Sequence, residues 1–155
     1  MIEENQELRI KNLLSFRDTI AQSEMQSTIT AIEKFITEKS LKAVGPKITT
    51  TYSISQAMTP TMDLEILIPI NRSFESTEKY KFKPELKITN ALKSVHKENP
   101  QEFNNSVMEI QKYIQDNKLM PITSLYTVTI NEVKNSNDMD KFHAELFISI
   151  NPNIC

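Results

Sequence analysis

Glycine is nearly absent from this 155-residue sequence, in which Gly45 is the single example. Loops that cradle phosphate groups, and turns that expose a nucleophilic serine, use several glycines. The backbone at such sites must approach its ligand closely or adopt left-handed angles, which other residues resist. The composition therefore excludes the familiar glycine-rich nucleotide-binding loops and nucleophile elbows.

Three further features are missing. Cys155 is the single cysteine, so no intramolecular disulfide can form, as is usual in a reducing cytoplasm. No run of eighteen apolar residues is present to cross a membrane. The 18 basic residues are spread along a chain of net charge −2, without the concentrated stripe that duplex nucleic acid requires. We expect a cytoplasmic protein that binds neither membranes nor nucleic acid.

What the sequence does contain is an internal repeat. Residues 7–12 (ELRIKN) match residues 85–90 (ELKITN) at an offset of 78, and the same offset aligns two apolar stripes. Each stripe has steps of four, three and four residues, the pattern of an amphipathic helix. The stripes are Met25, Ile29, Ile32 and Ile36 in the first half, and Phe103, Val107, Ile110 and Ile114 in the second.

Each predicted helix is preceded by a residue that can cap it. Ser23, followed by Gln26, forms a capping-box pattern in the first half. In the second half Asn99 can cap, with Pro100 at the first helical position. We therefore expect both helices to start at these points.

Two strand-like runs follow each helix. Residues 47–54 and 125–130 are rich in threonine, isoleucine and tyrosine, which favour strands. Residues 64–71 (LEILIPIN) match 144–151 (AELFISIN) at an offset of 80, so the second half gains two residues in the preceding hairpin. The sequence predicts an α+β fold with two strand-helix-strand-strand halves in one antiparallel sheet, both helices on one face. The predicted organisation is a single domain, 1–155, with repeat 1 at about 5–71, a linker at about 72–81 and repeat 2 at about 82–153.

Alternation along the closing strands divides their residues between two faces. Leu64, Ile66, Ile68 and Ile70 should face the first helix, and Leu146, Ile148 and Ile150 the second. We assigned the opposite face the residues Glu65, Leu67, Glu145, Phe147, Thr49, Thr51, Thr127 and Thr129. Such a face suits a ligand-binding cleft between the halves, with apolar walls and a few polar anchors. The ordinary alternative is that both glutamates are solvated on an uncovered sheet face.

Catalytic and metal-binding patterns are missing. His96 and His143, the two histidines, have no neighbouring ligands at zinc spacing, so we expect both on the surface. Nothing places a nucleophile beside a base, and Cys155 at the chain end is a poor position for one. We therefore expect no cofactor, no metal and no enzymatic activity.

The duplicated pattern resembles the GyrI-like family of effector-binding domains. The closing strands, LEILIPIN and AELFISIN, look like that family's terminal strand. The Gly45-Pro46 pair and the Asn151-Pro152-Asn153 ending are similar to those of a stand-alone, uncharacterised Gram-positive branch without a DNA-binding domain. The resemblance implies a non-catalytic domain that binds cationic, lipophilic small molecules, with Glu145 and Glu65 countering the ligand's charge.

Two other functions stay open. One is a protein-interaction module, an accessory or chaperone to an LXG-type toxin of type VII secretion, with Met58 and Met62 as contact residues. The other is a hydrolase of the GyrI-like type. The absence of tryptophan departs from family clefts that use aromatic stacking. The sequence leaves the oligomeric state and the ligand's identity open.

Overall fold

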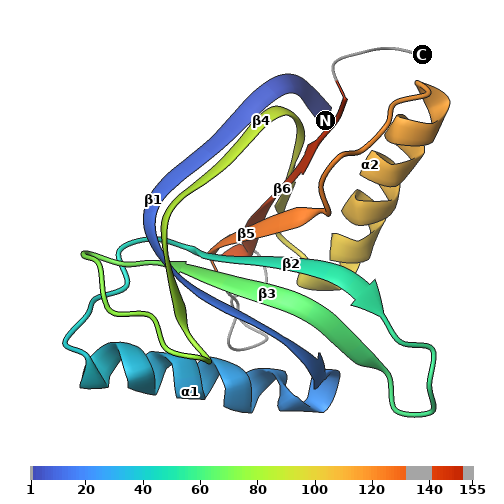
Figure 1. Ribbon diagram of the computed structural model, residues 1–155. Coiled ribbons are helices and arrows are strands. Elements are labelled where there is room, and N and C mark those ends of the chain that lie inside the picture. Colours follow the sequence, from blue (N-terminus) through green and yellow to red (C-terminus); the bar gives the residue numbers. More distant parts are fainter. Residues whose placement is uncertain (1, 132–140, 152–155) are drawn as a thin grey trace. The chain divides into compact units, whose positions relative to one another are not determined.

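The computed structural model describes residues 2–131 and 141–151. Its elements follow the predicted order within each half, with a short 3-10 turn before each helix (Figure 1). They are β1 (Ile2–Ala21), η1 (Gln22–Glu24), α1 (Met25–Glu38), β2 (Lys47–Ile54), β3 (Thr61–Pro69), β4 (Lys81–Lys97), η2 (Pro100–Glu102), α2 (Phe103–Asp116), β5 (Tyr126–Asn131) and β6 (His143–Ser149). The fold class is α+β, as predicted.

The sheet is antiparallel, as expected, but its hydrogen-bonded strand order closes on itself. That order is β1-β3-β2-β5-β6-β4, a closed barrel. Sequence patterns predict strands and their faces, whereas closure depends on which strand edges pair, and that was not predicted.

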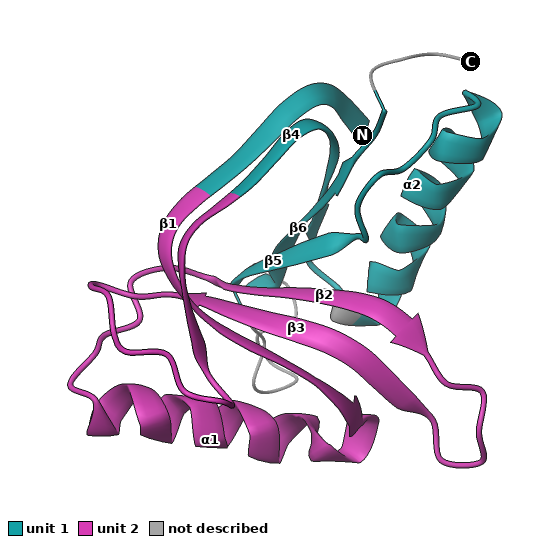
Figure 2. Ribbon diagram, viewed as in Figure 1, with its two compact units in different colours: residues 1–9, 87–155 teal, residues 10–86 magenta. Residues whose placement is uncertain are grey.

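The chain forms two compact units, and each is described by itself (Figure 2). One comprises residues 10–86, and the other comprises residues 1–9 and 87–155. Strands β1 and β4 extend well beyond the matching segments 7–12 and 85–90. Each of the two strands contributes residues to both units. For brevity we call residues 10–86 the α1 unit and the remainder the α2 unit.

In the α1 unit, the helix packs its predicted stripe on strands β1 and β3. Ile32 and Ile36 are buried, and Met25 and Ile29 pack against the same cluster. The cluster also contains Leu64, Ile66 and Ile68 of β3 and Ile70 just after it, the residues predicted to face this helix. Phe74 and Tyr80, from the segment predicted as a linker, also pack here, so this segment contributes to the unit's core.

The α2 unit repeats this packing on a smaller scale. Ile110 and Ile114 are buried against Leu92 and Ile148, with Ile150 beside them. Ile2, from the start of β1, also packs on this cluster. No described helix is both long and apolar enough to span a membrane.

Backbone hydrogen bonds recur at equivalent positions of the two units. The amide of Leu41 donates to Ile36 O, as that of Leu119 does to Ile114 O, both at 2.9 Å. Asn12 and Asn90 both have positive φ, 58° and 49°, an angle that asparagine tolerates better than most residues.

The helix starts agree with the sequence in one unit only. Asn99 Oδ1 accepts from the amide of Gln101 at 3.0 Å, as a capping residue does. In the α1 unit the expectation for Ser23 is wrong, because Ser23 lies inside the 3-10 turn. There the Glu24 side chain accepts from the amide of Ala21 at 2.8 Å instead.

Candidate functional site

Strand β3 lies between β1 and β2. One face of β3 points away from α1, and the pairing register determines which side chains of β1 and β2 lie on that face. Glu65 is paired with Arg17 on β1 and with Thr50 on β2. Directly opposed residues of an antiparallel pair point to the same side of the sheet. In the same way Leu67 is paired with Ser15 and Ile48.

Glu65 is a buried carboxylate with three donors around it. It is 2% exposed. Its Oε2 accepts from Ser15 Oγ and from Lys83 Nζ, each at 2.5 Å, and its Oε1 accepts from the Tyr52 hydroxyl at 2.6 Å. The expectation of a solvated glutamate is therefore wrong here.

These donors determine the charge of the carboxyl group. Burial raises the pKa of Glu65, but the hydrogen bonds from Lys83, Ser15 and Tyr52 and the Lys83 charge lower it, and together they outweigh burial. The net result is a pKa below the usual glutamate value, so Glu65 is ionised at neutral pH.

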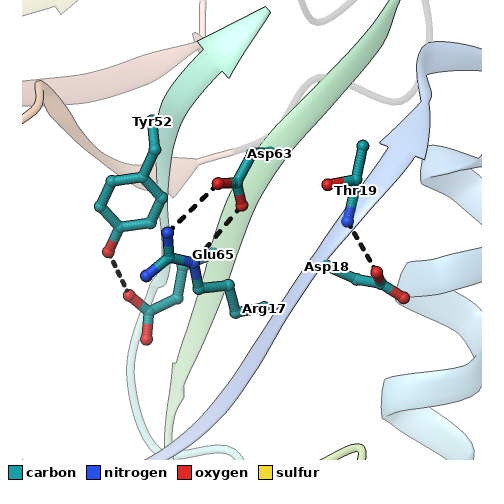
Figure 3. A network of polar contacts seen from close by, with 6 residues as sticks. All are labelled: Arg17, Asp18, Thr19, Tyr52, Asp63 and Glu65. Atoms are coloured by element: carbon teal, nitrogen blue, oxygen red, sulfur yellow. Dashed lines mark hydrogen bonds and ion pairs between the residues drawn. The ribbon is translucent and has the colours of Figure 1, made fainter.

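Around Glu65 lies a second layer of charge (Figure 3). The Arg17 guanidinium lies 4.0 Å from the centre of the Tyr52 ring and pairs with Asp63 through contacts of 3.4 and 3.2 Å. The hydrogen bond to Asp63 raises the pKa of Arg17. The Tyr52 ring thus already holds a cation against one face, while its hydroxyl contacts Glu65.

Lys83 reaches solvent although its partner Glu65 is buried. Its side chain is 44% exposed, whereas that of Glu65 is 3% exposed. The buried carboxylate therefore has a counter-ion that reaches solvent. If the lysine leaves, another cation must take its place, because an unpaired buried carboxylate is costly.

The repeat-equivalent acid of the α2 unit has different surroundings. Glu145 Oε2 lies 3.5 Å from Lys93 Nζ and 3.9 Å from His143 Nε2, and its side chain is 20% exposed. Phe147, on the same strand face, is buried, and Lys93 Nζ lies 5.6 Å from its ring centre. No hydroxyl donor to Glu145 is found among the described residues.

Four threonines were assigned to the wrong face. Thr127 and Thr129 are paired with Leu146 and Ala144, so they lie on the opposite side of the sheet from Glu145. Thr49 and Thr51 are likewise paired with Ile66 and Leu64. Alternation within a strand separates two sets of residues, but a one-residue slip of register exchanges their faces. The residues that share the face of Glu65 on β2 are instead Ile48 and Thr50.

The sequence also failed to identify the partners of Glu65. Ser15 and Lys83 lie 50 and 18 residues from it in the sequence, and only strand pairing brings them together. His96 was expected on the surface, but it is half-buried, and its ring nitrogens lie 2.8 Å from Ser106 Oγ and from Asn99 O. Among residues 2–131 and 141–151, no group of three or more acidic, histidine or cysteine side chains is arranged to hold a metal ion.

No protein-family model and no curated protein matches the sequence. Solved structures do match. The chain is similar to EcmrR in its complex with DNA, with a TM-score of 0.75 and 17% identity over 97% of this chain. It spans 56% of that EcmrR chain. The crystal structure of the EcmrR C-terminal domain matches at a TM-score of 0.69 and 16% identity, covering 97% of this chain and 96% of the domain.

A further match carries a bound compound. SAV2435 bound to tetraphenylphosphonium has a TM-score of 0.53 and 9% identity, covering 98% of this chain and 93% of that one. At these identities the likeness establishes the fold. The fold is consistent with the GyrI-like resemblance, and a protein of this fold binds a small organic cation.

Proposed function

We propose that this chain is a small-molecule-binding domain whose ligand is a lipophilic organic cation, with Glu65 as the residue that counters the ligand's charge. The observation that supports this is a buried, ionised carboxylate whose counter-ion, Lys83, is half exposed. A buried carboxylate needs a positive partner, and a ligand cation can provide one in place of a lysine.

Binding is then an exchange of cations. The incoming ligand displaces the Lys83 ammonium, which moves into solvent. Ser15 and Tyr52 keep their hydrogen bonds to the carboxylate and hold it in place during the exchange. Tyr52 is 39% exposed, and the Arg17 guanidinium lies 4.0 Å from the centre of its ring. Leu67, two residues further along the same strand face, is fully buried.

The α2 unit offers a second acid with an aromatic neighbour. Glu145 and Phe147 lie on one strand face, with Lys93 as the nearby cation. Glu145 is a weaker candidate than Glu65, because it is less buried and has fewer donors to keep it in place. The two acids are tested separately.

The contacts of Glu65 favour binding over hydrolysis. Ser15 donates its hydroxyl proton to Glu65, which resembles a nucleophile beside a base. However, a carboxylate whose pKa lies below its usual value is a weak general base at neutral pH, since the best bases have pKa values near the working pH.

Isothermal titration calorimetry with tetraphenylphosphonium tests the proposal. We expect saturable binding that is weakened about tenfold or more by Glu65→Gln, since loss of a buried charge partner costs roughly 2 kcal/mol or more. Glu145→Gln is the matched control, with the same change in charge, and should retain affinity within about threefold. Triphenylphosphine oxide, a neutral compound of similar size, should bind more weakly than the cation.

Three results would contradict the proposal. The first is that the cation gives no heat of binding. The second is that the cation and the neutral compound bind with equal affinity. The third is that wild type and Glu65→Gln bind the cation with equal affinity. A loss of binding in Glu145→Gln with Glu65→Gln unaffected would move the site to the α2 unit and refute the role of Glu65.

A further inference from the structure

The α2 unit contains a cavity of about 390 Å³ at the C-terminal end of its helix. Its lining combines four asparagines and a carboxylate with two apolar side chains. The lining includes Glu4, Asn90, Asn117, Leu119, Ile150 and Asn151. All of them belong to the α2 unit.

The corresponding place in the α1 unit is occupied by a guanidinium. Arg72 Nη2 donates to Lys39 O at 2.7 Å and lies 3.4 Å from Ser40 O, at the end of α1. Arg72 Nη1 donates to Ser73 O at 3.3 Å. The arginine therefore satisfies carbonyl groups that the end of a helix leaves without an intrahelical partner.

The backbone around these two places is the same. Ser40 and Lys118, which follow the two helices, have positive φ of 56° and 55°. The amide of Asn71 donates to Lys42 O at 3.1 Å, and that of Asn151 to Met120 O at 2.8 Å. Further equivalent pairs are the bridges Ala43–Ile70 and Pro121–Ile150. By this equivalence Asn117, which lines the cavity, corresponds to Lys39, and Lys118 corresponds to Ser40.

The side chains differ where the cation would lie. At the offset of 80 that aligns the closing strands, the residue matching Arg72 is Pro152, whose side chain has no donor. The residue of β1 matching Phe82 at the offset of 78 is Glu4, which accepts a hydrogen bond from the Tyr113 hydroxyl. The α2 cavity therefore has the same helix end as the α1 unit, no arginine at the matching sequence position, and an added carboxylate.

We propose that this cavity binds a guanidinium group supplied by another molecule. The negative end of the α2 dipole and the Glu4 carboxylate favour a cation. In the α1 unit the Arg72 guanidinium reaches two carbonyl oxygens at the helix end. A planar guanidinium suits such a pair of acceptors better than an ammonium group does. The site is separate from Glu65 and does not depend on the function proposed above.

The α1 unit also indicates which second side chain of a peptide ligand could bind beside its arginine. Phe74, two residues after Arg72, packs edge-on against Phe35 of α1 at 5.5 Å between ring centres. The counterpart of Phe35 is Tyr113, next to a shallow hollow with Ile2. An arginine within a peptide segment could therefore gain a second contact that a small guanidine compound lacks.

Amide NMR titration of the full chain tests the proposal with two guanidinium compounds. Agmatine represents a small guanidine, and the peptide acetyl-Asn-Arg-Ser-Phe-amide copies residues 71–74. The same peptide with citrulline in place of arginine is the uncharged control. We expect saturable shifts centred on Asn117, Leu119 and Asn151, in the millimolar range for agmatine, and none with the citrulline peptide.

The variant Glu4→Gln should weaken binding about two- to fivefold, the usual range for an exposed charge pair. Glu3→Gln, with the same change of charge one residue away, should leave it unchanged. Tighter binding of the peptide than of agmatine identifies an arginine of a protein segment as the occupant, and equal binding identifies a small guanidine. Absence of saturable shifts, equal shifts with the citrulline peptide, or an unaltered affinity in Glu4→Gln would overturn the proposal.

Discussion

Replacing Glu65 by glutamine removes one charge from a buried cluster while keeping the size of the side chain. Oε2 accepts from both Lys83 and Ser15, and Oε1 accepts from Tyr52. In glutamine one oxygen becomes an amide nitrogen, which can only donate. If the nitrogen takes the place of Oε2, the Lys83 ammonium loses its acceptor, whereas the Ser15 hydroxyl can turn and accept.

The size of the effect follows from these contacts. Hydrogen bonds to a charged group contribute about 1.5–3 kcal/mol each, compared with about 1 kcal/mol for neutral pairs. Two neutral bonds survive in the variant, and Lys83 recovers hydration because its side chain is 44% exposed. We therefore expect Glu65→Gln to lower the free energy of unfolding by about 1–3 kcal/mol at pH 7. For a chain of this length the melting temperature should fall by roughly 2–10 °C.

The same substitution predicts a pH dependence with a definite sign. The folded-state pKa of Glu65 lies below its ordinary value, so the ionised carboxylate stabilises the fold above the unfolded-state pKa. That stabilisation is lost as the pH falls through the folded-state pKa. The difference in stability between wild type and Glu65→Gln should therefore be largest near neutral pH and shrink below about pH 4.

Urea unfolding followed by circular dichroism, from pH 7 down to about pH 3, measures this difference directly. Glu145→Gln is the control, and it should cost less than about 1 kcal/mol, because its ion pairs are longer and partly exposed. Equal stability of wild type and Glu65→Gln at pH 7, or a difference that grows toward acid, would refute the reasoning about this carboxylate.

Three further predictions concern the repeated framework. Ile32→Ala and Ile110→Ala each truncate a fully buried helix residue, so each should lower the free energy of unfolding by about 2–5 kcal/mol in denaturant titrations. Asn12→Ala should cost about 1 kcal/mol at a φ of 58°, whereas Asn12→Gly should be nearly neutral; equal losses in calorimetric melts would contradict a backbone origin. Gly45→Val should cost roughly 1–3 kcal/mol, because a Cβ there already meets Pro69 carbons at 3.1 Å; an unchanged denaturation midpoint would show that the loop moves freely.

Local periodicity was sufficient to predict much of the fold. The stripe containing Ile32 and its match containing Ile110 identified both helices, since a step of four, three and four residues places apolar groups on one side of a helix. The isoleucines of β3 were assigned to the helix side for the same kind of reason, and they pack there. Closure of the strand order depends on pairing between strand edges, which no local pattern encodes.

The candidate site was predicted only in part. Glu65 and Leu67 were assigned to the right strand face, but Thr127 and Thr129 were assigned to the wrong one. Alternation shows which residues of one strand share a face. Which residues of two neighbouring strands share a face depends on how the strands pair, and alternation within each strand does not reveal that register. The donors to Glu65 depend on that register as well, which is why Ser15 and Lys83 were missed.

The two units share the backbone features that maintain the fold, but the surroundings of their equivalent acids differ. The hydrogen bonds of Leu41 and Leu119, and the positive φ angles of Asn12 and Asn90, recur because the same backbone must be built twice. The acids occupy equivalent positions, yet Glu65 has two hydroxyl donors and an ammonium group, and Glu145 has Lys93 and a histidine. Packing of the repeat does not require the hydroxyl cluster, since the α2 unit is built without it. Among the described residues, the hydroxyl cluster around Glu65 has no counterpart at Glu145, and the ligand exchange that we propose at Lys83 gives a physical reason for this difference.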